Sequence, residues 1–215
     1  MSLWDYVSSR RQQLLTDTYQ QASLVFQCMV VATLVGIAVA VLAYRSERVA
    51  RPVIATTVTV LTIPSYALLG LLIPVLGLGV PPSVAALVLY ALLPIIRNAI
   101  AGLRGVDPGL VDAARGIGMN RLAQLAKVEL PVAWPTVLGG IRVATQMSMG
   151  IAAVAAYASG PGLGNEIFSG ISGLGSANAL NQVLAGTIGI IVLALLFDAA
   201  LVLLGRLTTS RGLRG

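Results

Sequence analysis

The sequence contains no histidine and one cysteine, Cys28, among its 215 residues. A single cysteine cannot form an internal disulfide, and a metal site built from cysteine and histidine needs several such ligands. The sequence also lacks a Gly-x-x-x-x-Gly-Lys-Ser/Thr segment, which excludes ATP binding in the manner of a P-loop. We therefore predict that the chain binds no metal or cofactor, is not an enzyme, and depends on a partner for energy.

Charged and aromatic residues are also scarce. They make up 10% and 5% of the chain, whereas hydrophobic residues make up 57% and the mean hydropathy is +0.89. A soluble domain has about 25% charged residues. The composition is therefore typical of a membrane protein. The first residues lack a basic start followed directly by an apolar core, so no cleavable signal peptide is predicted.

Several apolar segments are long enough to cross a hydrocarbon core, which needs about 20 residues. They cover roughly residues 23–44, 52–76, 83–100, 135–157 and 183–204. We therefore predict an all-α membrane domain with about five spans. Its parts would be an amphipathic interfacial segment at 1–22, a transmembrane domain at 23–205 and a basic tail at 206–215. The transmembrane domain would contain a charged loop at 105–133 and an external loop at 158–182. A loosely ordered tail is the alternative for 1–22.

The distribution of arginine and lysine predicts the orientation. The loop after the first span holds three, residues 97–127 hold five and the C-terminal tail holds three, whereas the segments at 77–82 and 158–182 hold none. The positive-inside rule then places the charged loop and the C-terminus in the cytoplasm and the N-terminus outside, although Arg10 and Arg11 argue mildly against this. The net charge of +6 thus reflects topology and does not indicate nucleic-acid binding. The tail is either a topological anchor or a sensor of anionic lipid.

The charged loop carries helix caps and breaks at Asp107, Pro108, Gly116, Gly118, Asn120 and Pro131. Asp107 before a proline is typical of a helix N-cap. Glycine accepts the left-handed backbone that ends a helix, so Gly118 predicts a corner. A second short helix is expected over residues 121–130, and Pro131 is expected to stop it. Two short amphipathic helices between membrane spans would offer a surface to another protein.

The spacing within this loop resembles a known signature. Asp112, Ala113 and Ala114 are followed three residues later by Gly118, and nine residues further on by Val128, Glu129, Leu130 and Pro131. This is similar to the cytoplasmic E-A-A signature of type I ABC importer permeases, with Asp for Glu and Val for Ile. The resemblance implies a coupling helix that docks into a groove of an ATPase subunit, through Asp112, Ala113, Ala114, Gly118, Val128, Leu130 and Pro131.

Further segments resemble the osmoprotectant branch of these permeases, which imports glycine betaine, choline, carnitine or proline betaine. They are P-S-Y-A-L-L-G-L-L-I-P, L-L-P-I-I-R-N, G-V-D-P-G-L-V-D-A-A-R-G-I-G-M, K-V-E-L-P and G-P-G-L-G, and the similarity covers roughly residues 25–205. The methionine-importer permeases share the five-span plan and are the alternative.

The resemblance implies an assembly in the bacterial inner or plasma membrane. It would contain a second permease subunit, identical or paralogous, ATPase subunits that hold ATP and Mg²⁺, and an external solute-binding protein. In that branch an aromatic cage of the binding protein recognises the quaternary ammonium. The spans of this chain contain no sequence cluster of Trp or Tyr, so the sequence predicts no tight cage here.

Polar residues and prolines within the spans are candidates for a translocation pathway. Prolines such as Pro64 and Pro94 are expected to interrupt helical backbone at membrane depth, which is tolerated where the freed backbone groups line a cavity. The alternative is that these prolines are simple packing kinks. The candidates are Pro64, Ser65, Tyr66, Tyr90, Asn98, Gln146, Met147 and Ser148. Isolated hydroxyl side chains more commonly join helices.

Arg142 and Asp198 are charged residues within predicted spans. Each lies eight residues from a cytoplasmic flank, or about 12 Å at 1.5 Å per residue. Because an unpaired charge at this depth is costly, equal depth predicts an ion pair between the fourth and fifth spans, and snorkelling of Arg142 is the alternative. A secondary transporter would show inverted repeats and several intramembrane acids, which this sequence lacks. A passive channel or scaffold is a further alternative.

Overall fold

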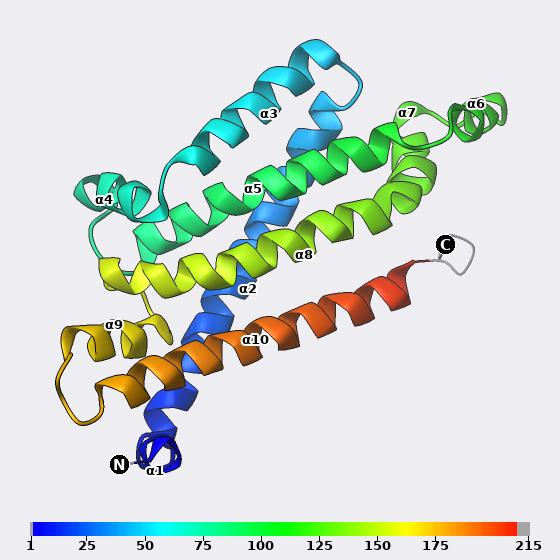
Figure 1. Ribbon diagram of the computed structural model, residues 1–215. Helices are drawn as coiled ribbons and strands as arrows, with labels where there is room; N and C mark the ends of the chain where they lie inside the picture. Colours follow the sequence, from blue (N-terminus) through cyan, green and yellow to red (C-terminus); the bar gives the residue numbers. More distant parts are fainter. Residues whose placement is uncertain (1, 210–215) are drawn as a thin grey trace.

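The computed structural model describes residues 2–209, which fold into helices joined by short connections (Figure 1). Four helical stretches are long and apolar enough to cross a membrane, and a bent pair supplies a fifth span if its two helices count as one. The spanning elements are α2 (Arg11–Ala43), the pair α3 (Glu47–Thr62) and α4 (Ser65–Leu76), α5 (Val80–Arg104), α8 (Leu130–Val154) with its flanking turns, and α10 (Ala179–Thr208). The predicted all-α membrane fold with about five spans is therefore confirmed.

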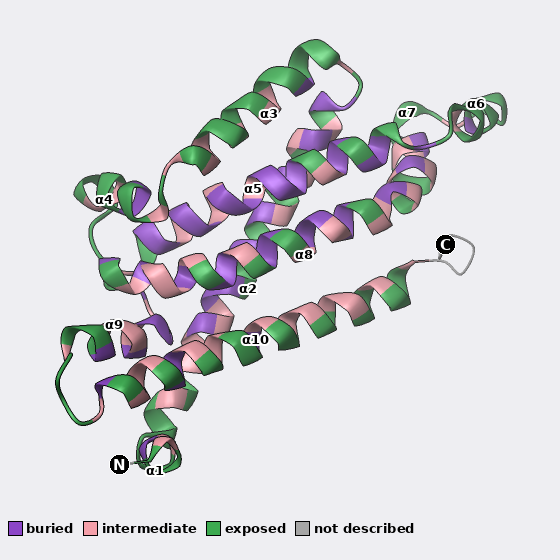
Figure 2. Ribbon diagram, in the orientation of Figure 1, coloured by how far each residue is buried: buried purple, intermediate pink, exposed green. Residues whose placement is uncertain are grey.

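The core lies where α2, α5 and α8 meet, and Figure 2 shows their facing sides as buried. Small residues allow the close approach: a Cβ added at Gly140 of α8 would lie 2.7 Å from the carbonyl oxygen of Pro94 on α5. Such contacts replace the hydrophobic driving force that is absent between helices in lipid. By contrast, α10 packs along one side and leaves much of its apolar surface exposed, as expected of a face that meets lipid (Figure 2).

The second span is broken at Pro64, where the sequence predicts a break. Helices α3 and α4 meet at 96°, and Ile63 between them has an extended ψ of 126°. A residue before proline is disfavoured in the helical region, which explains the conformation of Ile63. Pro94 does not interrupt its helix, since α5 continues through it, and of the two alternatives stated from the sequence the packing kink is the one that agrees with this. The neighbouring spans bury that part of α5, and packing of this kind tolerates a proline inside a span.

The N-terminal boundary differs from the sequence prediction. Helix α1 (Leu3–Ser9) is short, and α2 begins at Arg11 and runs unbroken across residues 22–23. The segment from 11 to 22 contains no glycine or proline, so nothing in it ends a helix. Gln21 also fixes it to the bundle, since its side chain donates to the carbonyl of Met149 and accepts from the amide of Leu163.

The two connecting regions lie at opposite ends of the bundle (Figure 1). The predicted loop at 158–182 contains the expected short helix, α9 (Gly164–Ser172), beside the start of α10. At the other end lie α6 (Pro108–Gly116) and α7 (Arg121–Gln124). The N-terminus lies at the α9 end. The C-terminal end of α10 lies toward the α6 end, and the tail residues Arg211 and Arg214 fall outside the described residues.

The prediction that Pro131 stops a helix is wrong. Helical structure continues from Arg121 to Ala158, and Pro131 occupies the first turn of α8. A π-helical turn, η1 (Leu125–Glu129), precedes it, with the amide of Leu130 bonded to the carbonyl of Leu125. A proline has no N–H and its ring clashes with the carbonyl four residues earlier. The wider π-turn shifts the hydrogen-bond pattern before Pro131, so the helix continues past the proline.

Candidate functional site

The corner between α6 and α7 is built by local backbone chemistry. Asp107 caps α6 by accepting from the amide of Gly109 at 2.8 Å. At the other end, the amide of Met119 bonds to the carbonyl of Ala114 at 3.1 Å, and the amide of Gly118 bonds to that of Arg115 at 3.0 Å. This pair of bonds is a Schellman motif. Gly118 has φ +84°, so the corner needs a residue that accepts the left-handed conformation.

The signature residues at this corner lie mostly on the surface. Asp112, Ala113, Gly118 and Pro131 are exposed, Val128 and Leu130 are partly buried, and Ala114 is buried. A Cβ added at Gly118 would meet no atom of residues 2–209 within 4 Å. The apolar side chains of Leu110, Ile117 and Leu122 are also exposed, with Ile117 at 75% and Leu122 at 77%. The corner therefore presents exposed apolar side chains, and the exposed Asp112 pairs only with its neighbour on α6, Arg115, at 3.4 Å among the residues that the structure describes.

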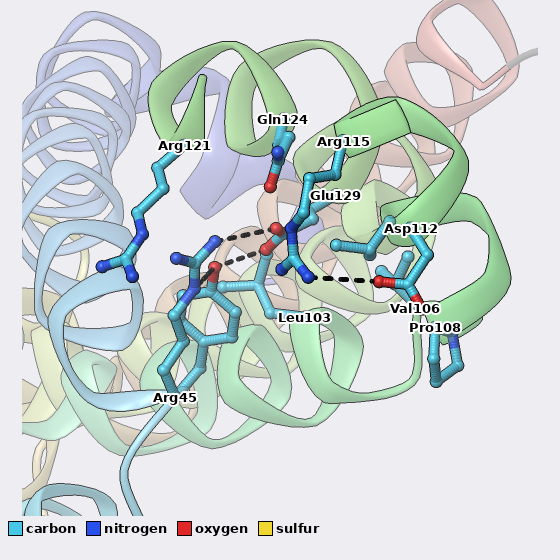
Figure 3. Close-up of a pocket in the computed structure, with 11 residues that line it drawn as sticks. Arg45, Leu103, Val106, Pro108, Asp112, Arg115, Arg121, Gln124 and Glu129 are labelled. Atoms are coloured by element: carbon cyan, nitrogen blue, oxygen red, sulfur yellow. Dashed lines mark hydrogen bonds and ion pairs between the residues drawn. The ribbon is translucent and has the colours of Figure 1, made fainter. Parts of the chain in front are cut away.

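A cleft of about 830 Å³ lies behind this corner, and Figure 3 shows the side chains around it. It is lined by Tyr44, Arg45, Leu103, Val106, Pro108, Val111, Asp112, Arg115, Arg121, Gln124 and Glu129. Glu129 on η1 is the buried acid of this cleft, with 3% of its surface exposed. Its carboxylate accepts from Arg45 Nη2 at 2.9 Å and from the hydroxyl of Tyr44. Arg104 Nε donates to the carbonyl of Tyr44 at 2.8 Å.

These contacts join the ends of α2 and α5 to the π-turn. Burial, and then the hydrogen bond to Glu129, raises the pKa of Tyr44 above its ordinary value. Burial lowers the pKa of Arg45, but its contacts with Tyr44 and Glu129 raise it by more. Tyr44 is therefore a neutral donor and Arg45 a cation at neutral pH. The cluster Tyr44–Arg45–Glu129, which we call the cleft triad, gives the corner a fixed attachment to the first span.

The structure brings Arg142 and Asp198 together between α8 and α10. Arg142 Nε and Nη2 donate to the two oxygens of Asp198, each at 2.9 Å, in the bidentate arrangement of a strong charge-assisted pair. Gln146 Nε2 adds a third donor at 3.2 Å from the same carboxylate. Two charged groups that would be costly in lipid are thus paired, and a residue considered for the pathway takes part in that pairing.

The other pathway candidates separate into different places. Pro64, Ser65 and Tyr66 lie at the α3–α4 bend, and the hydroxyl of the buried Tyr90 donates to the carbonyl of Ile63 in that bend. The remaining candidates lie elsewhere on the inner helices. Asn98 donates to the carbonyl of Pro94 within α5, Ser148 donates to the sulfur of Met29 between α8 and α2, and Met147 is partly buried on α8. The structure thus gathers the residues of the bend and disperses the others.

Sequence reasoning missed the cleft triad and a polar contact at the opposite end. There the hydroxyl of Tyr6 donates to the buried Glu166 of α9 at 2.5 Å, and Gln13 Nε2 donates to the same carboxylate at 3.1 Å. Burial and the bond to Glu166 raise the pKa of Tyr6 to about 12. Glu129 was detectable as an acid inside the signature, and Arg45 as the first residue after a span. Nothing local links Tyr6 to a residue 160 positions away.

Comparison with known proteins identifies the family. Residues 32–210 match the family described as the inner membrane component of binding-protein-dependent transport systems. The osmoprotectant import permease protein OsmW of Salmonella typhimurium is 39% identical over 214 residues, covering 97% of this chain and 98% of that protein. The choline transport system permease protein OpuBB of Bacillus subtilis is 32% identical, covering 97% of this chain and 94% of its own length.

A solved structure confirms the fold. The chain superimposes on the inward-facing MetNI methionine ABC transporter with a TM-score of 0.79, covering 92% of this chain and 96% of the other at 23% identity. An identity this low supports a shared fold and nothing about the solute. The resemblance to osmoprotectant permeases stated from the sequence is confirmed by the relatives. The chain therefore belongs to the family of inner-membrane components of binding-protein-dependent transport systems, and its sequence relatives are permeases of osmoprotectant importers.

Proposed function

We propose that this chain is the transmembrane subunit of an ATP-driven importer for quaternary ammonium compatible solutes of the glycine betaine, choline and carnitine type. The relatives support this solute class. They include a glycine betaine/carnitine/choline permease of Bacillus subtilis at 32% identity over 98% of this chain, and the osmoprotectant permease at 39%. The fold supports membrane transport, and the absence of a P-loop in the sequence calls for a separate ATPase.

The observation that carries the ATPase contact is the exposed Gly118 corner. Its backbone is fixed by a Schellman motif, and the cleft triad attaches the following π-turn to the first span, yet Ile117 and Leu122 remain largely exposed and the described residues leave open space at Gly118. A rigid, exposed corner with apolar side chains suits a groove on a partner, and the signature spacing resembles that of ATPase-docking loops. Motion of the ATPase would reach the spans through η1. The ATPase can shift the equilibrium between two conformations of the permease only if it contacts the corner differently in each.

The rest of the assembly follows from the same proposal. A second permease subunit would complete the pathway, an external binding protein would deliver the solute at the α9 end, and ATP with Mg²⁺ would be held by the ATPase. The placement of arginine and lysine supports a cytoplasmic α6–α7 end and an external N-terminus. In Figure 1 the two ends of the described chain lie on opposite sides of the bundle, as an odd number of spans requires.

The coupling proposal can be tested with Gly118→Asn. Asparagine tolerates the left-handed backbone, so this change adds a side chain with little strain, and the isolated chain has room for it. We expect solute-stimulated ATP hydrolysis and uptake by the reconstituted complex to fall together. Gly116→Asn is the matched control, because that position also has open space and ends α6. Unchanged solute-stimulated hydrolysis in Gly118→Asn would remove the docking role.

The solute class is tested by ATP-dependent uptake into proteoliposomes that contain the permease, its ATPase and its binding protein. Labelled glycine betaine, choline, carnitine and methionine are compared. Uptake of a quaternary ammonium solute is the expected result. Uptake of methionine alone would keep the importer and change its solute to that of the methionine-importer permeases, the alternative left open by the sequence. Uptake without any ATPase would refute the importer proposal and indicate a secondary transporter or a channel.

A further inference from the structure

Three aromatic side chains that are distant in the sequence meet at the α9 end of the bundle. Tyr66 lies at the start of α4, Tyr157 in the short 3-10 turn η2 (Ala155–Ala158), and Phe168 on α9. The ring centroids of Tyr66 and Tyr157 are 5.2 Å apart, with an angle of 66° between the planes. Those of Tyr66 and Phe168 are 6.3 Å apart at 64°. We call these three residues the aromatic corner.

The geometry of the aromatic corner suits a quaternary ammonium group. A cation is attracted to an aromatic face when it lies within about 6 Å of the ring centroid. Because neighbouring centroids here are 5.2 and 6.3 Å apart, one trimethylammonium group can satisfy this distance for more than one ring. Both pairs are T-shaped contacts, in which the edge of one ring meets the face of its neighbour. Tyr66 is 46% exposed and Tyr157 is 57% exposed, so the rings are accessible from outside the chain.

The elements that carry the aromatic corner have no positive charge of their own. Helix α4, turn η2 and helix α9 contain no lysine or arginine, and their one charged residue is Glu166. In the part of the chain that the structure describes, arginines lie over the rings of Tyr6 and Tyr44 and over none of these three. The faces of the corner are therefore not occupied by a cation of the protein itself, and no fixed positive charge of these elements repels one.

Three exposed threonines lie on α3, the helix that precedes Tyr66 in the chain. Thr56, Thr59 and Thr62 are exposed at a spacing of three residues, which places them along one side of the helix, and the α3–α4 bend follows directly. Each hydroxyl donates to a backbone carbonyl of its own helix. Such a surface offers a solute polar contact without a strong binding group, as a path needs if the solute is to be released.

We propose that the aromatic corner of Tyr66, Tyr157 and Phe168 is a weak binding site in the permease for the trimethylammonium group of the transported solute. This inference rests on the proposed function and adds a place of recognition within this chain. The sequence predicted no cage because the three residues are 91 and 11 positions apart in the chain, and only the packing of α4, η2 and α9 brings them together.

The experiment uses the permease–ATPase complex in lipid nanodiscs without binding protein. Choline and its neutral isostere 3,3-dimethylbutan-1-ol are titrated separately, with ligand-observed NMR as the readout. We expect choline to bind more tightly than the isostere. Tyr66→Leu and Tyr157→Leu should each weaken choline by about two- to fivefold and leave the isostere unchanged, because a cation–π contact needs charge and ring together. Tyr66→Phe should bind choline like the wild type.

The control is Tyr19→Leu, which removes a ring that is 74% exposed on α2 and should change neither affinity. Equal weakening of choline and isostere in Tyr66→Leu would indicate a plain apolar contact and overturn the proposal, as would an unchanged choline affinity. The uptake assay with the binding protein separates the two proposals. If the wild type imports quaternary ammonium solutes while these variants bind choline normally, the aromatic corner fails and the function stands. If no quaternary ammonium solute is imported, both fail.

Discussion

Replacing Arg45, the exposed partner of the ion pair in the cleft triad, should lower the free energy of unfolding more than replacing the buried Glu129. The side chain of Glu129 is 4% exposed and that of Arg45 is 43% exposed. Among the described residues, Arg45→Gln leaves the buried carboxylate with the hydroxyl of Tyr44 as its one donor, and an uncompensated buried charge costs about 3–5 kcal/mol. Because one donor remains, we expect about 3 kcal/mol for Arg45→Gln.

Glu129→Gln removes the charge at the buried position. Arg45 can then turn toward water, and the amide oxygen still accepts one hydrogen bond. The expected loss of unfolding free energy is that of one hydrogen bond to a charged group, about 1.5–3 kcal/mol. Because Arg45 is 43% exposed, we expect a value near the lower end of this range. The double variant should be more stable than the sum of the single losses predicts, with a coupling energy of about 1 kcal/mol or more.

The assay is equilibrium unfolding of the purified subunit in mixed detergent micelles, followed by the loss of helicity. Arg48→Gln is the matched control, since Arg48 is exposed on the same segment and a surface change of this kind stays within about 0.5 kcal/mol. Two results would refute the reasoning. One is a larger loss for Glu129→Gln than for Arg45→Gln, and the other is additive losses in the double variant.

Two further sets of substitutions test the contacts between the spans. Arg142→Gln leaves Asp198 with Gln146 as its donor, and Asp198→Asn leaves Arg142 without its carboxylate, so each should lower the folded yield in membranes, by about 1–3 kcal/mol in stability. The double variant should recover part of that yield, and a double variant no better than the singles would show that the pairing contributes nothing. Gly140→Ala places a Cβ 2.7 Å from the carbonyl oxygen of Pro94 and should lower the thermal stability by about 1–3 kcal/mol, because α5 and α8 must move apart. Gly139→Ala adds the same atom where none lies within 4 Å, and equal melting temperatures for the two variants would contradict this account of the packing.

Local signals in the sequence predicted much of the corner. Asp107 before a proline gave the start of α6, and Gly118 gave the left-handed residue at its end, because both depend on the backbone chemistry of a few neighbouring residues. Pro131 was misread for the same reason. A proline alone predicts a stop, but the π-turn before it lets the helix continue, and that turn is held by Glu129 through contacts with residues more than 80 positions away.

Composition and the lengths of the apolar segments determined the membrane setting and the approximate number of spans, and the resemblance of residues 112–131 to a known signature indicated the role of the corner, because each depends on residues close together in the chain. The equal depth of Arg142 and Asp198 could also be counted along two apolar segments. The tertiary structure decided which polar residues meet. It placed Glu129 against the end of α2, Glu166 against Tyr6, and Tyr66 against Tyr157 and Phe168. Such contacts depend on which helices pack side by side. In this bundle small residues and helix bends set that packing, and they act between segments that are far apart in the sequence.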